Sequence, residues 1–311
     1  ETENERLLDD GDTGPMRELY LRELIARFSH HPALTWNLGE ENGPAPWSPH
    51  AQTDAQRKAM ASFLKRVDPY QHPVVLHTHS YEPVRSEVLS PILGFKDLDG
   101  LALQVDQREG AAEQVRTWRA RSRAAGHEWL VSLDEIGMWH TGALPDTLDP
   151  EHDTLRRYVL WGTLLSGAAG VEWYFGAHHP HNDLTSEDWR ERARLWELTR
   201  FARTFMEAYL PFWEMEPAHE LVDAPLAYCL RKPGACYAIY VADAGRHTLD
   251  LSGVEGTFEV AWFDPLAGGA LQRGSVSRLH GGDVVDLGSP PPAQGPGSKQ
   301  DWVALVRTAP E

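Results

Sequence analysis

Three consecutive segments, GLALQVD (residues 100–106), AAEQVRTWRARSRAA (111–125) and EWLVSL (128–133), decide the fold of this chain. The first and third are short, apolar and bounded by polar residues, as buried β-strands are, whereas the second has the length and composition of a helix. A strand–helix–strand unit of this size predicts two parallel strands joined by a helical crossover. The sheet is therefore expected to be parallel and to have helices on its faces.

The same alternation extends over residues 1–221, which form the first predicted domain. Its five strand-then-helix units place strands at 33–39, 73–79, 100–106, 128–133 and 170–175. A helical pattern at 54–67 precedes the second of these strands. A closed barrel needs eight such units. The pattern therefore fits either the last five units of a (β/α)8 TIM barrel, with its first three strands upstream of Glu1, or an open sheet. We favour the barrel, because the segment before the first helix has the character of a loop that follows a strand.

The pattern changes near residue 222, and the second predicted domain comprises residues 222–311. Short strands alternate there with turns rich in Gly, Pro and Asp, and the sequence has no helical periodicity. The segments 226–230 and 236–241 flank the turn RKPG and predict a hairpin. A small antiparallel β-sandwich is expected. Cys229 and Cys236 are equidistant from the turn, which makes a disulfide across the hairpin geometrically possible. The alternative is two buried free thiols.

Composition excludes several classes of function. The 311 residues include 46 Asp and Glu against 29 Lys and Arg, which gives a formal net charge of −17. Binding to nucleic acids or to anionic membranes needs basic surfaces, and no apolar run approaches the ~20 residues of a bilayer span. No nucleic-acid partner and no membrane insertion are therefore expected. The 12 Trp residues favour a carbohydrate partner, because indole rings stack on the apolar faces of sugars.

Two pairs of acidic residues follow strands of the first domain. Glu40 and Glu41 come after the first strand, and Asp134 and Glu135 come after the fourth. Because the carboxyl ends of parallel strands meet at one edge of a sheet, these acids are expected to lie together. Glycosidic bond cleavage needs two carboxyl groups, one to protonate the leaving oxygen and one to attack or stabilise the anomeric carbon. The alternative is that the acids are solvated or cap the next helix.

Other polar residues at strand ends are candidates for contacts with sugar hydroxyls or with the carboxylates. His77 and His79 end the second strand, and Asp106 ends the third. Only one of the two histidines is expected to point inward, because side chains alternate along a strand. The remaining candidates for substrate contacts lie beside the acids: Glu40, Asn42 and Trp139.

The run HHPHND at residues 178–183 contains three histidines, and histidine is a common metal ligand. It lies in a Pro-containing loop and lacks the i, i+4 spacing of helical metal-binding histidines. A loop that contributes to substrate binding is favoured, and neither a metal nor a cofactor is expected. The sequence also lacks a phosphate-binding Gly loop, a Gly-x-Ser-x-Gly elbow and a dinucleotide-binding fingerprint.

The two acidic motifs resemble those of retaining glycoside hydrolases of the clan A barrel type. In that clan a Trp-x-x-Gly-Asn-Glu strand end carries the acid/base, and a Thr-Glu-Phe-Gly-like strand end carries the nucleophile. WNLGEEN at 36–42 is similar to the first and LDEIG at 133–137 to the second. The resemblance implies Glu41 as the acid/base and Glu135 as the nucleophile. Glu40 stands where the clan usually has Asn, so the choice between Glu40 and Glu41 stays open, and the alignment favours Glu41.

The layout of the whole chain is similar to apiosidase-like bacterial glycosidases, which carry a C-terminal β-domain of the collagen-binding type. AWFDP at 261–265 resembles a strand end of that domain, and Trp173 matches the eighth-strand tryptophan that forms the floor of the sugar subsite. The resemblance implies hydrolysis of a poly- or oligosaccharide by a retaining double displacement, in an extracellular or periplasmic location. The alternatives are a non-catalytic carbohydrate-binding or scaffold protein, and a metal-dependent hydrolase that uses the histidine run.

Overall fold

The chain divides into two compact units. The computed structural model describes residues 6–46, 48–136, 140–182, 185, 187–292 and 301–309. The first unit comprises Glu1–Gln107, Gln114–Met138 and Ala168–Tyr174, and the second comprises Arg108–Glu113, Trp139–Gly167 and Phe175–Glu311. The domain boundary near residue 221 stays a prediction, because the second unit joins segments from both sides of it.

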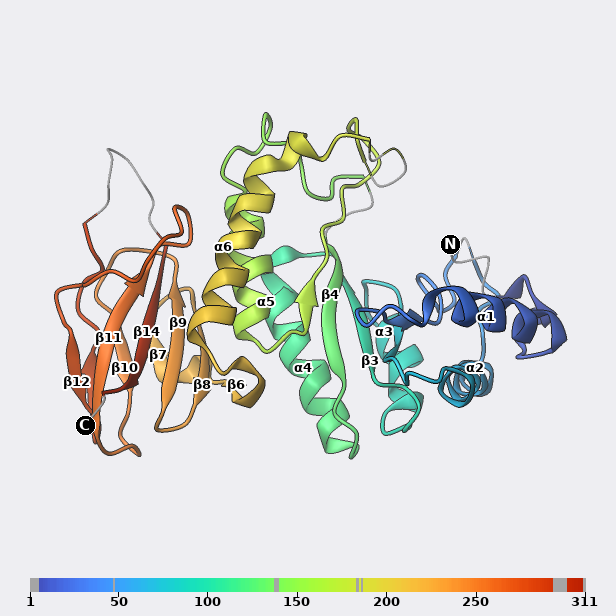
Figure 1. Ribbon diagram of the computed structural model, residues 1–311, viewed down its shortest axis with the longest axis horizontal. Helices are drawn as coiled ribbons and strands as arrows, with labels where there is room; N and C mark the ends of the chain where they lie inside the picture. Colours follow the sequence, from blue (N-terminus) through green and yellow to red (C-terminus); the bar gives the residue numbers. More distant parts are fainter. Residues whose placement is uncertain are drawn as a thin grey trace. The chain divides into compact units, whose positions relative to one another are not determined.

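The first unit is built around a five-stranded sheet whose strands follow one another in sequence order. Its members are β1 (Trp36–Asn37), β2 (Val74–His77), β3 (Gly100–Val105), β4 (Leu130–Ile136) and β5 (Gly170–Val171). Figure 1 labels two of these strands, β3 and β4. All four pairings are parallel. The prediction of five parallel strands is therefore confirmed. Closure into a barrel is not shown, since β1 and β5 are the two edges of the described sheet.

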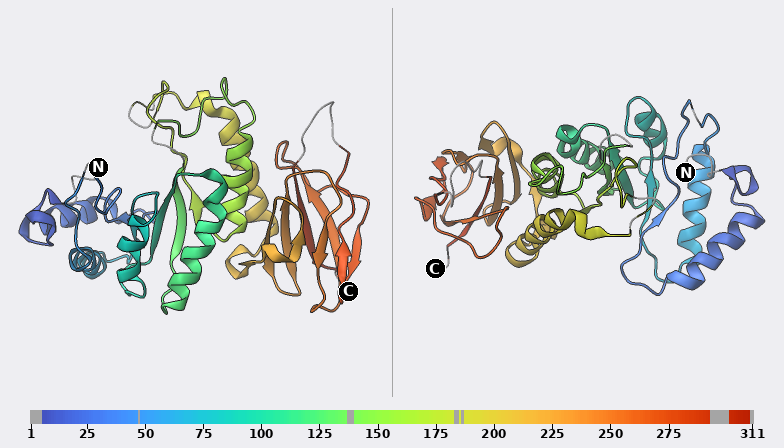
Figure 2. Two further views of the ribbon diagram at one scale, coloured as in Figure 1. Left: turned by 180° about the vertical axis from the view of Figure 1, so that it is seen from behind. Right: turned by 90° about the horizontal axis from the view of Figure 1, so that it is seen from above.

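The strands and helices of the first unit have the expected patterns of burial. β2 and β3 are buried along their whole length, as strands covered on both faces must be, which explains their continuous apolar sequence. α1 contacts α2, and α2 contacts β2; the right-hand view of Figure 2 shows the two helices side by side. The helices that alternate with the strands are α1 (Pro15–Phe28), α2 (Asp54–Val67), the unpredicted α3 (Val84–Leu89) and α4 (Ala111–Ala124).

The second unit begins its regular structure with helices. A π-helical turn, Leu155–Trp161, continues into α5 (Gly162–Leu165), and α6 (Ala193–Tyr209) follows later in the chain. None of the helices that the structure describes has the length and apolarity needed for a membrane span.

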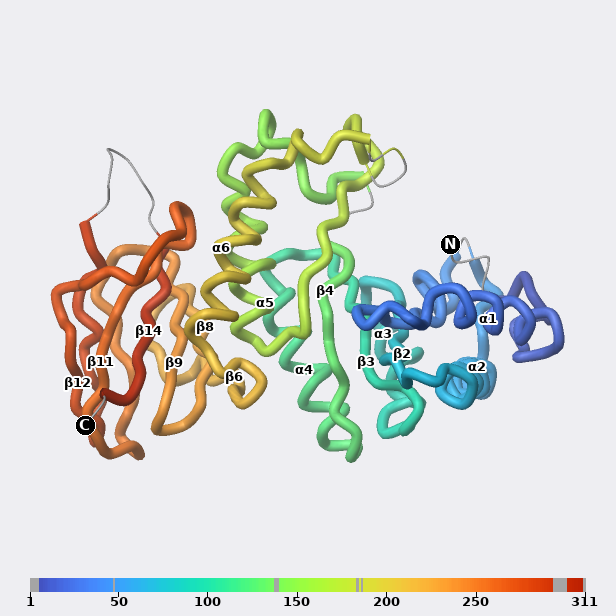
Figure 3. The backbone as a smooth tube through the Cα atoms, viewed as in Figure 1, coloured from blue at the N-terminus to red at the C-terminus, as the bar shows by residue number. Residues whose placement is uncertain are grey.

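Two antiparallel sheets complete the second unit. One has six strands in the order β12-β11-β14-β9-β8-β6, and the other has three in the order β13-β10-β7. In Figure 3, β8, β9, β14 and β11 run side by side. The strands are β6 (Glu216–Pro217), β7 (Val222–Asp223), β8 (Ala227–Lys232), β9 (Cys236–Val241), β10 (Thr248–Asp250), β11 (Thr257–Phe263), β12 (Arg278–His280), β13 (Val284–Asp286) and β14 (Trp302–Thr308).

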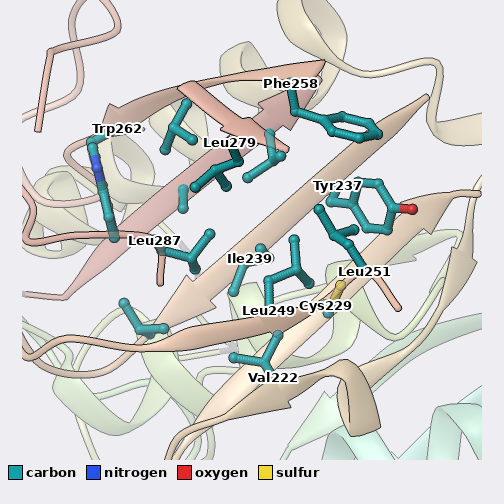
Figure 4. Close-up of a cluster of buried hydrophobic side chains, with 14 of the residues drawn as sticks. Val222, Cys229, Tyr237, Ile239, Leu249, Leu251, Phe258, Trp262, Leu279 and Leu287 are labelled. Carbon is teal, nitrogen blue, oxygen red and sulfur yellow. The ribbon is translucent and has the colours of Figure 1, made fainter. Parts of the chain in front are cut away.

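Both antiparallel sheets contribute to one hydrophobic core. Val222 and Leu249 of the three-stranded sheet lie in one buried cluster with Ile239, Phe258 and Trp262 of the six-stranded sheet (Figure 4). Burial alternates along most of β11, which is the pattern of a strand with one covered face. The expectation of antiparallel strands after residue 222 is therefore confirmed.

The two cysteines are buried free thiols. Cys229 pairs with Ile239 across the β8–β9 hairpin, and Cys236 pairs with Lys232. The alternative of two buried thiols is therefore confirmed, and that of a disulfide is wrong, because the two cysteines are not register partners in this hairpin. Burial raises the pKa of Cys229 to about 12 and that of Cys236 to about 11, which makes both thiols poor nucleophiles.

Candidate active site

The loop after β1 carries Glu41 and is anchored by the residue that follows it. Asn42 is fully buried, and its backbone N–H donates to the carbonyl of His77 at 2.9 Å. Its side-chain amide donates to Gln52 at 2.9 Å, and its Oδ1 accepts from Arg57 Nε at 2.7 Å. A substrate contact by Asn42 stays a prediction. Both ends of the side chain are bonded inside the protein, and they position the loop.

The backbone of this loop adopts conformations that most residues avoid. Glu41 has φ +46°, in the left-handed region, where a residue with a side chain is uncommon. At Gly43 an added Cβ would lie 2.8 Å from Val88 Cγ2, so only glycine fits without displacing its neighbour. Such conformations persist where the surroundings hold them, and they concentrate at functional sites.

Both oxygens of the Glu41 carboxyl group face polar side chains. Oε1 accepts a hydrogen bond from Gln104 Nε2 at 3.2 Å, and Oε2 lies 3.6 Å from Nδ1 of the buried His79. The ring of Tyr81 lies 5.6 Å from that of His79. Burial raises the pKa of Tyr81, and the carboxylates of Glu41 and Asp106 raise it further. A quarter of the Glu41 side chain, 25%, is exposed, which leaves it accessible to a ligand.

A β-bulge places Glu135 in this site. The regular register between β3 and β4 would set Gln104 opposite Asp134, but the register shifts there and Gln104 pairs with Glu135. The prediction had placed both acids after the strand, whereas β4 extends to Ile136 and contains them. Bulges re-aim side chains next to active sites. Here the extra residue is Asp134, whose pKa burial raises.

Glu135 is 8% exposed and lies beside a histidine that stays neutral. His77 Nε2 is 3.7 Å from Glu135 Oε2. Burial lowers the pKa of His77 to about 4, and the nearby Glu40 carboxylate and Gln104 amide offset only part of this effect. At neutral pH the ring therefore carries no charge and forms no ion pair with Glu135. Glu40 itself is exposed.

The structure brings the two expected catalytic acids to the end of the sheet at which its parallel strands have their carboxyl termini. Gln104 contacts Glu41 through its side chain and is the register partner of Glu135. The expectation that only one histidine faces the carboxylates is wrong. His77 and His79 are two positions apart, and such residues lie on the same face of an extended chain, so alternation gives no reason to separate them.

Three further residues are predicted to contact substrate: Asp106, Trp173 and Trp139. Asp106 is exposed and accepts a hydrogen bond from Ser80, and Trp173 is buried just beyond β5. Substrate contacts by these two residues stay predictions. Trp139 lies outside the described residues. Among the residues that the structure describes, no group of three His, Cys, Asp or Glu side chains is arranged to hold a metal ion.

Arg85 is a supporting residue that the sequence did not reveal. Its guanidinium group is buried, and Nη1 donates to the carbonyls of Ser80 at 2.8 Å and Gln104 at 2.9 Å. It therefore ties the segment after β2 to the end of β3. Arg85 lies in the short helix α3, and nothing in the local pattern distinguishes it from a solvated arginine.

Comparisons with known proteins show solved structures that have a similar fold. No protein-family model matches the sequence, and no curated protein matches it. A glycoside hydrolase family 5 protein from Bacteroides vulgatus matches 94% of this chain with a TM-score of 0.66 and 16% identity. A second structure, a glycoside hydrolase, matches 94% with the same TM-score and identity. The fold resembles that of glycoside hydrolases. The chain covers 66% of the first protein and 68% of the second, about two thirds of their length.

Proposed function

We propose that this protein is a glycoside hydrolase that cleaves O-glycosidic bonds of a poly- or oligosaccharide by a retaining double displacement. The observation that carries the proposal is that Gln104 contacts Glu41 and is the register partner of Glu135, which places both acids at the carboxyl-terminal end of the parallel strands. Two carboxyl groups in such a position are the chemical requirement of this reaction. The likeness of fold supports the proposal. The proposal also includes that the five parallel strands are the last five of a (β/α)8 barrel, and that the chain is related to apiosidase-like glycosidases of clan A.

The two acids have different proposed roles because their surroundings differ. In the first step an oxygen of Glu135 bonds to the anomeric carbon as the bond to the leaving oxygen breaks, and Glu41 donates its proton to that oxygen. In the second step Glu41 takes a proton from water, whose oxygen displaces Glu135 from the anomeric carbon. The nearly buried Glu135 suits attack on a bound sugar, and the more exposed Glu41 suits proton exchange with the leaving group and water.

The test is hydrolysis of aryl glycosides and polysaccharides by the purified chain, with the anomer of the first product identified by proton NMR. We expect retention, and we expect Glu135→Gln to lower kcat by at least about 10³-fold. Glu41→Ala is expected to be rescued by azide on substrates with good leaving groups, because azide attacks the glycosyl-enzyme without needing a base. Comparing Glu40→Gln with Glu41→Gln decides which adjacent glutamate is the acid/base.

Glu23→Gln, which alters an exposed carboxylate on α1, is the matched control. Full activity of Glu135→Gln, or a product of inverted configuration, would contradict the mechanism. Saccharide binding without any hydrolysis would favour the carbohydrate-binding alternative.

A further inference from the structure

The hydrogen bond between His79 and the loop after β1 determines where the ring holds its proton. His79 Nε2 lies 3.0 Å from the carbonyl oxygen of Gly43, and the ring is fully buried. A carbonyl oxygen only accepts hydrogen bonds, so Nε2 must be the protonated nitrogen. In the neutral ring Nδ1 therefore carries a lone pair and acts as an acceptor. That lone pair lies on the side of the ring that faces Glu41.

The Glu41 carboxyl group is arranged to bring a proton to this lone pair. Oε1 already accepts a hydrogen bond from Gln104, and Oε2 lies 3.6 Å from His79 Nδ1. A carboxylate oxygen and an imidazole lone pair repel each other unless one of them carries a proton. Separations of this size are common before a substrate binds, and they shorten in the reactive complex.

We propose that His79 is a positioning residue that shares a single proton with Glu41 and keeps this proton available for the leaving group. The inference rests on the proposed function, in which Glu41 is the acid/base. The shared proton resides either on Glu41 Oε2 or on His79 Nδ1, and it passes from Glu41 to the leaving oxygen when the glycosidic bond breaks. The deprotonated pair is then disfavoured, which promotes uptake of a proton from the attacking water in the second step.

The neighbouring carboxylate–histidine pair has different properties. His77 Nε2 lies 3.7 Å from Glu135, and burial lowers the pKa of this ring to about 4. His77 therefore stays neutral beside Glu135, the residue that the proposed function requires as an ionised nucleophile. The buried neutral ring of His77 beside Glu135 and the Nδ1 lone pair of His79 facing Glu41 therefore suit the nucleophile role and the acid role, respectively.

Other titratable and charged groups also surround the pair. Tyr81 contacts the His79 ring, and Asp106 follows β3. The His77 ring interacts electrostatically with His79, and the Arg85 guanidinium binds the backbone of the segment after β2. The two tests therefore change only His79 or Glu41 and leave these neighbouring groups as they are.

The first test follows the ring nitrogens of ¹⁵N-labelled histidine in the wild-type chain by NMR, with His79→Gln used for assignment. The neutral His79 ring is expected to be the Nε2–H tautomer. Its transition is expected to fall by at least one pH unit in Glu41→Gln, a tenfold change in proton affinity, because the carboxylate that stabilises the proton is gone. An Nδ1–H tautomer, or the same transition in both proteins, would overturn the proposal.

The second test compares hydrolysis of phenyl and 2,4-dinitrophenyl glycosides by the wild type and His79→Gln. A poor leaving group needs the proton, so kcat/KM for the phenyl substrate is expected to fall about tenfold or more, and its alkaline limb to move to lower pH. The dinitrophenyl substrate is expected to lose less than about threefold. Equal losses on both would indicate a merely structural role and contradict the proposal. If the wild type hydrolyses no glycoside, the proposed function fails, whereas the NMR test still reports whether the proton is shared.

Discussion

Two clusters of buried polar groups in this molecule are built in different ways. In the second unit the carboxylate of Asp301 is completely buried and receives contacts of between 2.6 and 3.0 Å. Arg156 and the Tyr240 hydroxyl bind its Oδ2, and Arg157 binds its Oδ1. This cluster links the π-helical turn to β9 and the residue before β14 within one unit. Each of its charges is matched at short range.

In the first unit the contacts around Glu41 and Glu135 are longer. The separations are 3.2 Å to Gln104, 3.6 Å to His79 and 3.7 Å to His77. Within the described parts of the chain, His77 Nε2 and Gln104 Oε1 are buried and form no hydrogen bond of good geometry, although Gln104 lies close enough to His77 to raise the pKa of its ring. Buried polar atoms of this kind are rare in proteins and are expensive to keep.

The difference teaches how to separate a structural polar cluster from a candidate functional one. In the Asp301 cluster every charge is paired at short range, although Arg157 Nη2 forms an ion pair with Asp301 and, among the described residues, no hydrogen bond. A cluster paired in this way holds elements together and leaves little capacity for a ligand. A partly satisfied cluster keeps donors and acceptors available and gives up stability to do so. The comparison therefore predicts large stability effects in the Asp301 cluster and small ones at Gln104.

The largest effect on stability is expected from Asp301→Ala. The change leaves the guanidinium of Arg156, which is buried, without its main partner, so the free energy of unfolding is expected to fall by about 3–5 kcal/mol. Urea unfolding of the full chain measures it. Asp153→Ala removes a partner of the same arginine that is 49% exposed and is the control, with an expected loss below about 1 kcal/mol. Equal losses of stability in the two variants would contradict the claim that the buried partner of Arg156 matters more than the exposed one.

A smaller effect is expected from the pH dependence of His77. The unfolded state protonates this ring near pH 6.5, whereas the folded state does so only near pH 4. The unfolded state thus binds more protons in this window, and the ring lowers stability as the pH falls from 6.5 to 4, by on the order of 3 kcal/mol. His77→Asn is expected to flatten the curve of unfolding free energy between these values.

The exposed His50 supplies the control for this experiment. His50→Asn should leave the slope of unfolding free energy against pH as it is in the wild type. If His77→Asn also leaves the slope unchanged, the folded ring does not resist protonation, and the account of a neutral residue beside Glu135 is wrong.

The smallest effect on stability is expected at Gln104, in comparison with a second buried glutamine. Gln52 donates to the Gly11 carbonyl at 2.8 Å and accepts from Asn42, so Gln52→Leu is expected to cost about 1–3 kcal/mol. Gln104→Leu is expected to change the unfolding free energy by less than about 1 kcal/mol, while kcat/KM for glycosides falls about tenfold. A loss of stability at Gln104 as large as that at Gln52 would assign the residue to the structural framework.

Sequence patterns predicted the elements of the fold well where the pattern is local. The helix expected at 54–67 is α2 with the same bounds, and the strand expected at 236–241 is β9. Both have a clear hydrophobic period and clear end signals, such as the capping box of Thr53 and Gln56. The first strand is shorter than expected, with two residues, because the chain leaves β2 soon after Trp36.

The sequence by itself determined the parallel sheet, the antiparallel strands that follow it and the two acids at strand ends, since apolar runs and the residues that end them are local properties. Only the tertiary structure decided which groups surround those acids. The bulge that sets Gln104 opposite Glu135, and the loop geometry that brings Glu41 to His79, depend on register between distant strands. The Arg156–Asp301 pair likewise joins residues 145 positions apart, a contact that no local pattern specifies.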